Sequence, residues 1–120
     1  LYGSDKMPFI FSICGSFWYP DFVAYCQSHQ LLNKSCSVYL CNGLTEGANH
    51  KNRLAKAPSF AKEVHECIKK QCLSTYSAFD PYGHHDNLQE RYDAFSDWLI
   101  EKWKLWNAAI GDWVGKREEK

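Results

Sequence analysis

Six cysteines in a chain of 120 residues constrain the fold of this protein more than any other feature. They are Cys14, Cys26, Cys36, Cys41, Cys67 and Cys72. An even number of cysteines in a short chain is typical of a disulfide framework. We therefore expect three disulfides, which form and persist in an oxidising, extracellular compartment.

The spacing of the cysteines restricts which pairs can form. If residues 59–75 are helical, the Cα atoms of Cys67 and Cys72 lie about 8.7 Å apart. A disulfide requires less than about 7 Å between the two Cα atoms, so these cysteines must bond elsewhere. The same argument separates Cys36 from Cys41, and more strongly if their segment is extended. The economical arrangement is two disulfides between these two segments.

The remaining pair, Cys14 and Cys26, would form the third disulfide. Two other uses of the thiols, a zinc site and catalysis, fit the sequence less well. Zinc usually takes cysteines from tight knuckles, and neither CSVYLC nor CIKKQC resembles one. His65 lies near the second segment, but no second histidine at metal-ligand spacing accompanies it. A catalytic cysteine would leave an odd thiol, whereas the count is even. We expect no catalytic residue, no metal site and no cofactor.

A long helix over residues 87–114 is the clearest secondary-structure prediction. Apolar side chains recur there at steps of three and four and form a stripe about 80° wide. The stripe consists of Leu88, Tyr92, Phe95, Leu99, Trp103, Trp106, Ile110 and Trp113. We expect it to face the core, with Trp103 and Trp106 buried.

The rest of the chain is less regular. Residues 59–75 and 20–30 have the pattern of helices, whereas the segments PFIFSIC and CSVYLCNG suit either a short helix or a strand. Because no segment alternates cleanly between apolar and polar residues, we predict an all-α fold. The prediction is a single secreted helical domain over residues 1–120, small and stapled by disulfides, with a long C-terminal amphipathic helix.

The most enzyme-like group is His84-His85-Asp86. A His-Asp pair on a helix suggests a secreted phospholipase, but the flanking cysteine and the glycine-rich calcium loop of that family are missing. Asp86 is explained more simply as a helix cap. Scattered Ser, His and Asp residues cannot be assembled into a triad from sequence. We expect a protein that is not an enzyme.

Two sets of residues are candidates for contact with a partner. Trp98, Ile100 and Leu105 lie off the apolar stripe, and exposed tryptophan is common at interaction hot spots. The second set is a basic loop with Lys51, Arg53 and Lys56. Because the net charge is zero, we expect no nucleic acid and no membrane insertion.

Several features suggest processing for secretion. The chain opens at Leu1 with no initiator methionine and has no apolar run of transmembrane length. Asn33-Lys34-Ser35 is a glycosylation sequon. We expect a secreted, extracellular protein whose signal peptide has been removed and whose candidate glycan acceptor is Asn33.

The layout of the whole chain resembles mature salivary proteins of blood-feeding mosquitoes of the anophensin and albicin type. The resemblance rests on size, the presumed processing before LYGSDKMPF, the six-cysteine helical plan and the tryptophan-rich C-terminal helix. It implies a disulfide-stapled helical protein that inhibits a host plasma protein complex without being an enzyme. The target would be the convertase of the alternative pathway of complement, or the contact-phase factors that form kinins. The alternative function is a carrier that holds a small lipophilic ligand in an aromatic cavity.

Overall fold

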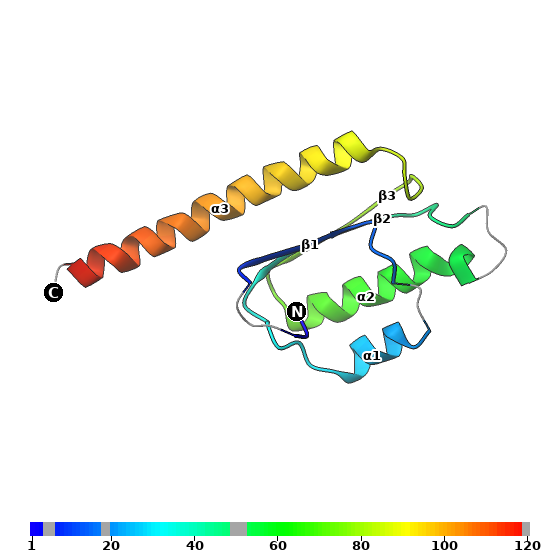
Figure 1. The fold of residues 1–120 in the computed structure, drawn as a ribbon, viewed down its shortest axis with the longest axis horizontal. Coiled ribbons are helices and arrows are strands. Elements are labelled where there is room, and N and C mark those ends of the chain that lie inside the picture. Colours follow the sequence, from blue (N-terminus) through cyan, green and yellow to red (C-terminus); the bar gives the residue numbers. More distant parts are fainter. Residues whose placement is uncertain (4–6, 18–19, 49–52, 119–120) are drawn as a thin grey trace. The chain divides into compact units, whose positions relative to one another are not determined.

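The computed structural model (Figure 1) describes the backbone of residues 1–3, 7–17, 20–48 and 53–118. Side chains are described for the same residues except 53, 54, 110 and 112–118. The chain divides into two compact units, Leu1–Asn87 and Leu88–Lys120, which are described in turn.

A three-stranded parallel sheet organises the first unit. Its strands, in spatial order, are β1 (Phe9–Ile13), β2 (Ser37–Gly43) and β3 (Thr75–Asp80). Ile13 pairs with Cys41 across β1 and β2, and Gly43 pairs with Asp80 across β2 and β3. Because all three strands run in the same direction, their carboxyl ends meet at one edge of the sheet.

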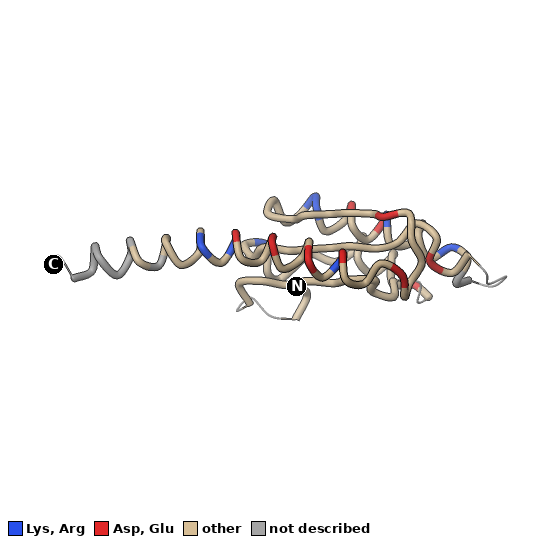
Figure 2. The backbone as a smooth tube through the Cα atoms, turned by 90° about the horizontal axis from the view of Figure 1, so that it is seen from above, with Lys and Arg blue, Asp and Glu red and all other residues tan. Residues whose placement is uncertain are grey.

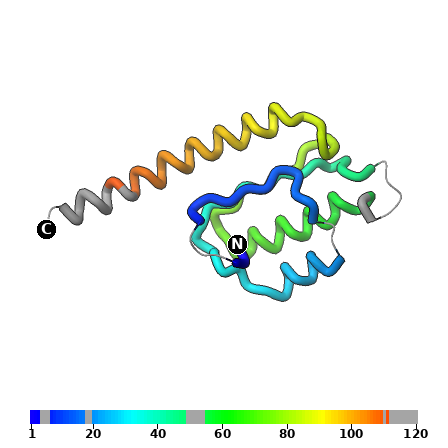
Figure 3. The backbone as a smooth tube through the Cα atoms, viewed as in Figure 1, coloured from blue at the N-terminus to red at the C-terminus, as the bar shows by residue number. Residues whose placement is uncertain are grey.

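Helical crossovers connect these strands, as parallel pairing requires. α1 (Phe22–Ser28) lies between β1 and β2, and a 3-10 turn η1 (Arg53–Lys56) followed by α2 (Ala57–Gln71) lies between β2 and β3. Figure 1 shows both helices on the same side of the sheet, and Figure 3 traces the course of the chain through them. This follows from the topology, because the sheet grows in one direction and such crossovers share one hand.

The core of the first unit lies between α2 and the sheet. Val38 and Leu40 of β2 are buried in one cluster with Val64 and Ile68 of α2 and Cys26 of α1. The inner face of α2 has the i, i+3, i+4, i+7 spacing of a half-buried helix, and its buried residues are Ala61, Val64, His65 and Ile68.

The predicted all-α fold is wrong, because the first unit is an α/β structure built on a parallel sheet. β2 lies in the segment CSVYLCNG and is buried from Val38 to Gly43. A central strand of a parallel sheet is covered on both faces, so it has a continuous apolar run in place of alternation. β3 lies outside the two segments that the sequence marked as possible strands. The helical character expected of the domain over residues 1–120 is corrected with the fold class.

The second unit consists of α3 (Leu88–Glu118), which confirms the helix predicted over residues 87–114. Its apolar stripe does not have the predicted burial. Trp103 and Trp106 are 49% and 37% exposed, so the prediction that they are core residues is wrong. No helix in the described part of the chain combines the length and the apolar character needed to cross a bilayer.

Candidate functional site

The carboxyl edge of the sheet brings three chemically active side chains together. Cys14 directly follows β1, Glu46 follows β2, and His84 follows β3. One ligand atom from each, namely the thiol sulfur, a carboxylate oxygen and a ring nitrogen, lies within 4.8 Å of the other two. Ligands of open α/β sheets bind outside the carboxyl ends of the strands. These three residues form the candidate functional site.

The β1–β2 pairing fixes the position of Cys14. Its backbone N–H donates a hydrogen bond to the carbonyl oxygen of Cys41 at 2.7 Å, and its side chain is buried. Its φ of 58° lies in the left-handed region, which is uncommon for a residue with a side chain. The next residue, Gly15, is tightly packed, because a Cβ there would overlap Oγ of Ser12 and lie 2.9 Å from Cζ of Phe17, so those side chains would have to move. The chain therefore turns sharply at the thiol.

Glu46 is buried, with 5% of its surface exposed, and both of its carboxylate oxygens have partners. Oε1 lies 3.0 Å from Nδ1 of His84, and Oε2 accepts a hydrogen bond of 3.0 Å from Nδ2 of Asn42. A buried carboxylate costs much free energy unless it is paired in this way. These contacts hold the carboxylate in one orientation.

A second histidine, His65 of α2, orients the amide of Asn42. Nδ2 of Asn42 also donates to the carbonyl oxygen of Gly15 at 3.1 Å, so its Oδ1 is the acceptor of the 2.8 Å bond from Nε2 of His65. Nδ1 of the neutral ring then accepts from the hydroxyl of Ser77 at 2.8 Å. Burial lowers the pKa of His65 to about 4, and nearby Lys69 adds to the effect. His65 is therefore neutral at pH 7.

The three site residues have two chemical uses. A cysteine, a histidine and a carboxylate can act as nucleophile, base and orienting group, or as three metal ligands. Nucleophilic attack requires a substrate to reach the sulfur, and Cys14 is only 8% exposed. The side chain of His84 is 47% exposed, which is enough for a small ion to enter beside it. The geometry favours metal ligation over nucleophilic catalysis.

The predicted disulfide framework is wrong. All six cysteines lie in described segments and are present as thiols. The sulfur of Cys72 lies 3.1 Å from the carbonyl oxygen of Cys36. The sulfur of Cys67 lies 2.9 Å from the carbonyl oxygen of Cys26. Burial, helped by the neighbouring Cys72 thiol, raises the pKa of Cys36 to about 11. The argument from three disulfides to an oxidising compartment therefore no longer holds.

The sequon residue Asn33 lies in the interior of the first unit. It is 2% exposed, its Nδ2 donates to the carbonyl oxygen of Met7 at 2.9 Å, and its Oδ1 accepts from the N–H of Cys36 at 3.2 Å. These bonds tie the loop before β2 to the chain before β1. A buried amide is not accessible as a glycan acceptor in the folded protein, so Asn33 has a structural role here.

The predicted partner-contact residues have different environments. Ile100 and Leu105 of α3 are 53% and 62% exposed, whereas Trp98 is only half-buried and its ring stacks on that of Phe95. In the basic loop, Lys51 lies outside the described residues. Arg53 begins η1, with its side chain outside the described part, and Lys56 ends η1 and is exposed. Of the two predicted sets, Trp98, Ile100 and Leu105 of α3 are the one whose side chains the structure describes in full.

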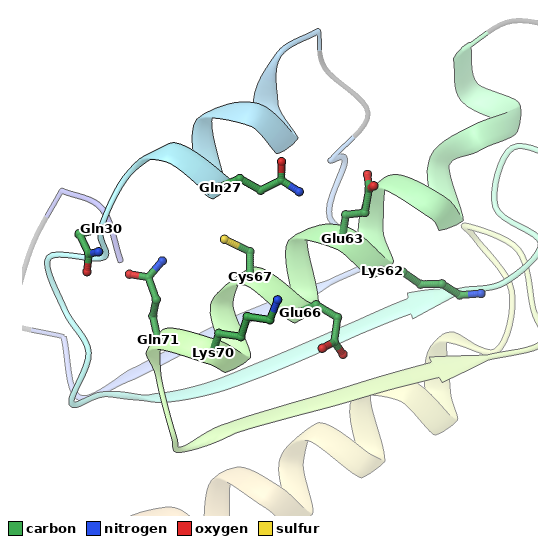
Figure 4. Close-up of a pocket in the computed structure, with 8 residues that line it drawn as sticks. All are labelled: Gln27, Gln30, Lys62, Glu63, Glu66, Cys67, Lys70 and Gln71. Carbon is green, nitrogen blue, oxygen red and sulfur yellow. The ribbon is translucent and has the colours of Figure 1, made fainter.

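A pocket of about 510 Å³ lies between α1 and α2 (Figure 4). Seven of its eight lining residues are polar or charged, and the thiol of Cys67 is the eighth: Gln27, Gln30, Lys62, Glu63, Glu66, Cys67, Lys70 and Gln71. Sites for lipophilic ligands are lined mainly by apolar and aromatic side chains. This pocket does not have the composition expected for a lipid carrier.

The sequence pattern alone does not reveal the site at the sheet edge. In the sequence His84 stands out only as part of a His-Asp pair, Cys14 fits a disulfide, and nothing marks Glu46. The available signal was that each residue closely follows a strand, but this signal exists only once the strands are recognised. No family model, no curated protein and no solved structure matches this chain.

Proposed function

We propose that this protein acts by contact with another protein, without chemistry, through the apolar stripe of α3. The observation that carries the proposal is the exposure of Trp103 and Trp106, whose rings pack at 5.1 Å on the surface of the helix. Large aromatic side chains left in water are the usual anchors of protein interfaces. Tyr92, at 51% exposed, lies on the same stripe three turns toward the start of the helix, and Phe95 and Leu99 between it and the tryptophans are half-buried.

The charges of α3 support this choice of surface. Its first half is acidic, as Figure 2 shows, and the acidic residues are Glu90, Asp93, Asp97 and Glu101. At 100° per residue these residues fall about 120–180° from the centre of the apolar stripe. A helix with an apolar face and a charged face suits the binding mode in which a helix lies in an apolar groove of its partner.

The spacing of the stripe favours an unlike partner over a second copy of the chain. Coiled-coil pairing uses a sustained heptad with aliphatic side chains at the a and d positions. From Leu88 to Trp106 the stripe advances by 4, 3, 4, 4 and 3 residues, which breaks the heptad, and the last two members of this range are tryptophans. Bulky indoles at irregular spacing suit the pockets of a groove better than a symmetric helix pair.

The partner that we propose to test first is a plasma protein complex. The resemblance to mosquito salivary inhibitors suggests the convertase of the alternative pathway of complement, with contact-phase factors as the second target. Of the points of that resemblance, the size and the tryptophan-rich C-terminal helix stand, whereas the all-helical, disulfide-stapled plan does not. No aromatic side chain of the described residues lines the pocket between α1 and α2, so this pocket is not the aromatic cavity that the carrier function requires. The exposed stripe is what an inhibitor that works by surface contact requires.

The test is an alternative-pathway haemolysis assay beside a contact-activation assay, both with the purified chain. We expect inhibition in one of them. Trp103→Ala should weaken it by about 30-fold, which corresponds to the roughly 2 kcal/mol typical of an interface anchor. Leu73→Ala is the matched control, because Leu73 is an apolar residue of the first unit that is 97% exposed.

Three outcomes would contradict the proposal. The first is the absence of inhibition in both assays at micromolar concentration. The second is an equal loss of inhibition in the Trp103→Ala and Leu73→Ala variants. The third is a dimer in light scattering that Trp103→Ala dissociates, which would make the stripe an interface between two copies of the chain.

A further inference from the structure

We propose that Cys14, Glu46 and His84 bind a divalent transition-metal ion, with zinc as the representative ion. The three side chains offer a thiolate sulfur, a carboxylate oxygen and an imidazole nitrogen, and one atom from each lies within 4.8 Å of the others. This mixture of ligand types suits zinc, which binds Cys, His and carboxylate side chains alike. The site is independent of the α3 surface.

The separations are close to those of a metal centre. Zinc bonds of about 2.0–2.3 Å in a tetrahedron place the ligand atoms roughly 3.3–3.8 Å apart. The His84 nitrogen and the Glu46 oxygen are already 3.0 Å apart. The remaining pairs, at no more than 4.8 Å, need to approach by about 1.0–1.5 Å at most. Three protein ligands leave the fourth position for water or another small ligand.

The surroundings orient the carboxylate ligand as metal sites require. Metal ligands are usually held by hydrogen bonds from a second layer of residues, and those partners tune affinity. Here Asn42 binds the second oxygen of Glu46 at 3.0 Å, and His65 binds Asn42 at 2.8 Å. His65 in turn is held by Ser77 at 2.8 Å. The chain of bonds runs from β3 through α2 and β2 to the ligand.

The topology explains why these residues converge. Each follows a different strand, and the parallel register brings the three carboxyl ends to one edge. Cys14 and Glu46 are buried, whereas His84 is exposed and gives an ion a route from solvent. On binding, the thiol proton of Cys14 passes to solvent, and the ion replaces the hydrogen bond between His84 and Glu46.

The experiment uses the full chain, reduced with a phosphine that does not bind metal and then loaded with Co²⁺ or Zn²⁺. We expect one ion per chain after dialysis, measured by elemental mass spectrometry. The Co²⁺ form should show the near-ultraviolet absorption of charge transfer from thiolate to cobalt. Cys14→Ser should abolish this absorption. His84→Ala should lower zinc affinity by about 100-fold or more, because loss of an outer partner alone costs up to that factor.

Two matched variants control for position and for thiol content. His85→Ala removes the exposed neighbour of His84. Cys41→Ser removes the thiol of Cys41, the residue whose backbone carbonyl accepts the hydrogen bond from the N–H of Cys14. Both should retain the ion. His84 lies at the surface, so His84→Ala is expected to fold even if Cys14→Ser does not, and circular dichroism checks this.

Two results would overturn the proposal. The first is a wild-type chain that retains no ion. The second is an unchanged affinity in the folded His84→Ala variant, which would place the ion at other thiols such as Cys26 with Cys67.

Discussion

The inner face of α2 and the apolar stripe of α3 follow the same helical spacing, but only one of them is buried. Ala61, Val64 and Ile68 of α2 are at most 4% exposed, whereas Tyr92 and Trp103 of α3 are about half exposed, at 51% and 49%. Regular spacing shows that a helix has a face that can be buried. Whether the face is buried depends on the surface that another element offers to it.

The two surfaces also differ in composition. The face of α2 is made of small or branched side chains around one polar residue, His65, whose two ring nitrogens are both hydrogen-bonded. No buried side-chain nitrogen or oxygen in the described part of the chain lacks a hydrogen-bond partner. The α3 stripe instead exposes aromatic side chains, whose large apolar area makes their exposure to water unfavourable in free energy. The first surface is suited to folding and the second to binding.

The largest effect that tests this contrast is expected from Ile68→Ala. Ile68 is 4% exposed and packs in the core cluster, so its truncation removes buried surface and leaves a cavity. We expect a loss of about 2–5 kcal/mol in the free energy of unfolding. Urea denaturation followed by circular dichroism measures it. Leu73→Ala, at a fully exposed position, should stay within about 0.5 kcal/mol. A loss below about 1 kcal/mol for Ile68→Ala would refute the assigned core.

An intermediate effect is expected from acidification. Burial lowers the pKa of His65 to about 4, whereas an unfolded histidine titrates near 6.5. The unfolded chain therefore binds a proton that the folded chain refuses, and stability falls as pH drops from about 6.5 toward 4. At pH 5 the loss from this group should be about 2 kcal/mol relative to pH 7.5. Urea denaturation at both pH values measures it.

A pair of variants isolates the contribution of this histidine. His65→Gln should flatten the decline in stability between pH 7.5 and pH 5, because the titrating group is gone. His85→Gln, at an exposed histidine, should leave the decline as it is in the wild type. An equal decline in the wild type and in His65→Gln would show that other groups control the acid sensitivity.

The smallest effect is expected from Trp103→Ala. Because half of the indole is already exposed, we expect a loss of less than about 1 kcal/mol in the free energy of unfolding. Alanine also favours the helix more than tryptophan does. The same urea denaturation measures it. A loss of about 3 kcal/mol or more, as for a buried tryptophan, would show that the stripe is covered in the folded chain and would remove the basis for a binding surface.

Much of the helical structure could be predicted from local pattern. The period of the side chains in α2 and α3 is a property of consecutive residues, so both helices were predicted close to their observed bounds. The strands were not, because β2 is buried on both faces and shows no alternation. The choice between a buried helix and a buried strand for SVYLC depends on neighbours that lie far away in the sequence.

The sequence by itself determined the two long helices, the zero net charge and the even set of six cysteines. Only the tertiary structure decided that Trp103 is exposed, that Asn33 is buried and that no disulfide forms. It also decided that Cys14, Glu46 and His84 share one site. Helical periodicity arises from hydrogen bonds between residues four apart, whereas the shared site depends on parallel strand pairing between segments separated by 28 or more positions in the register.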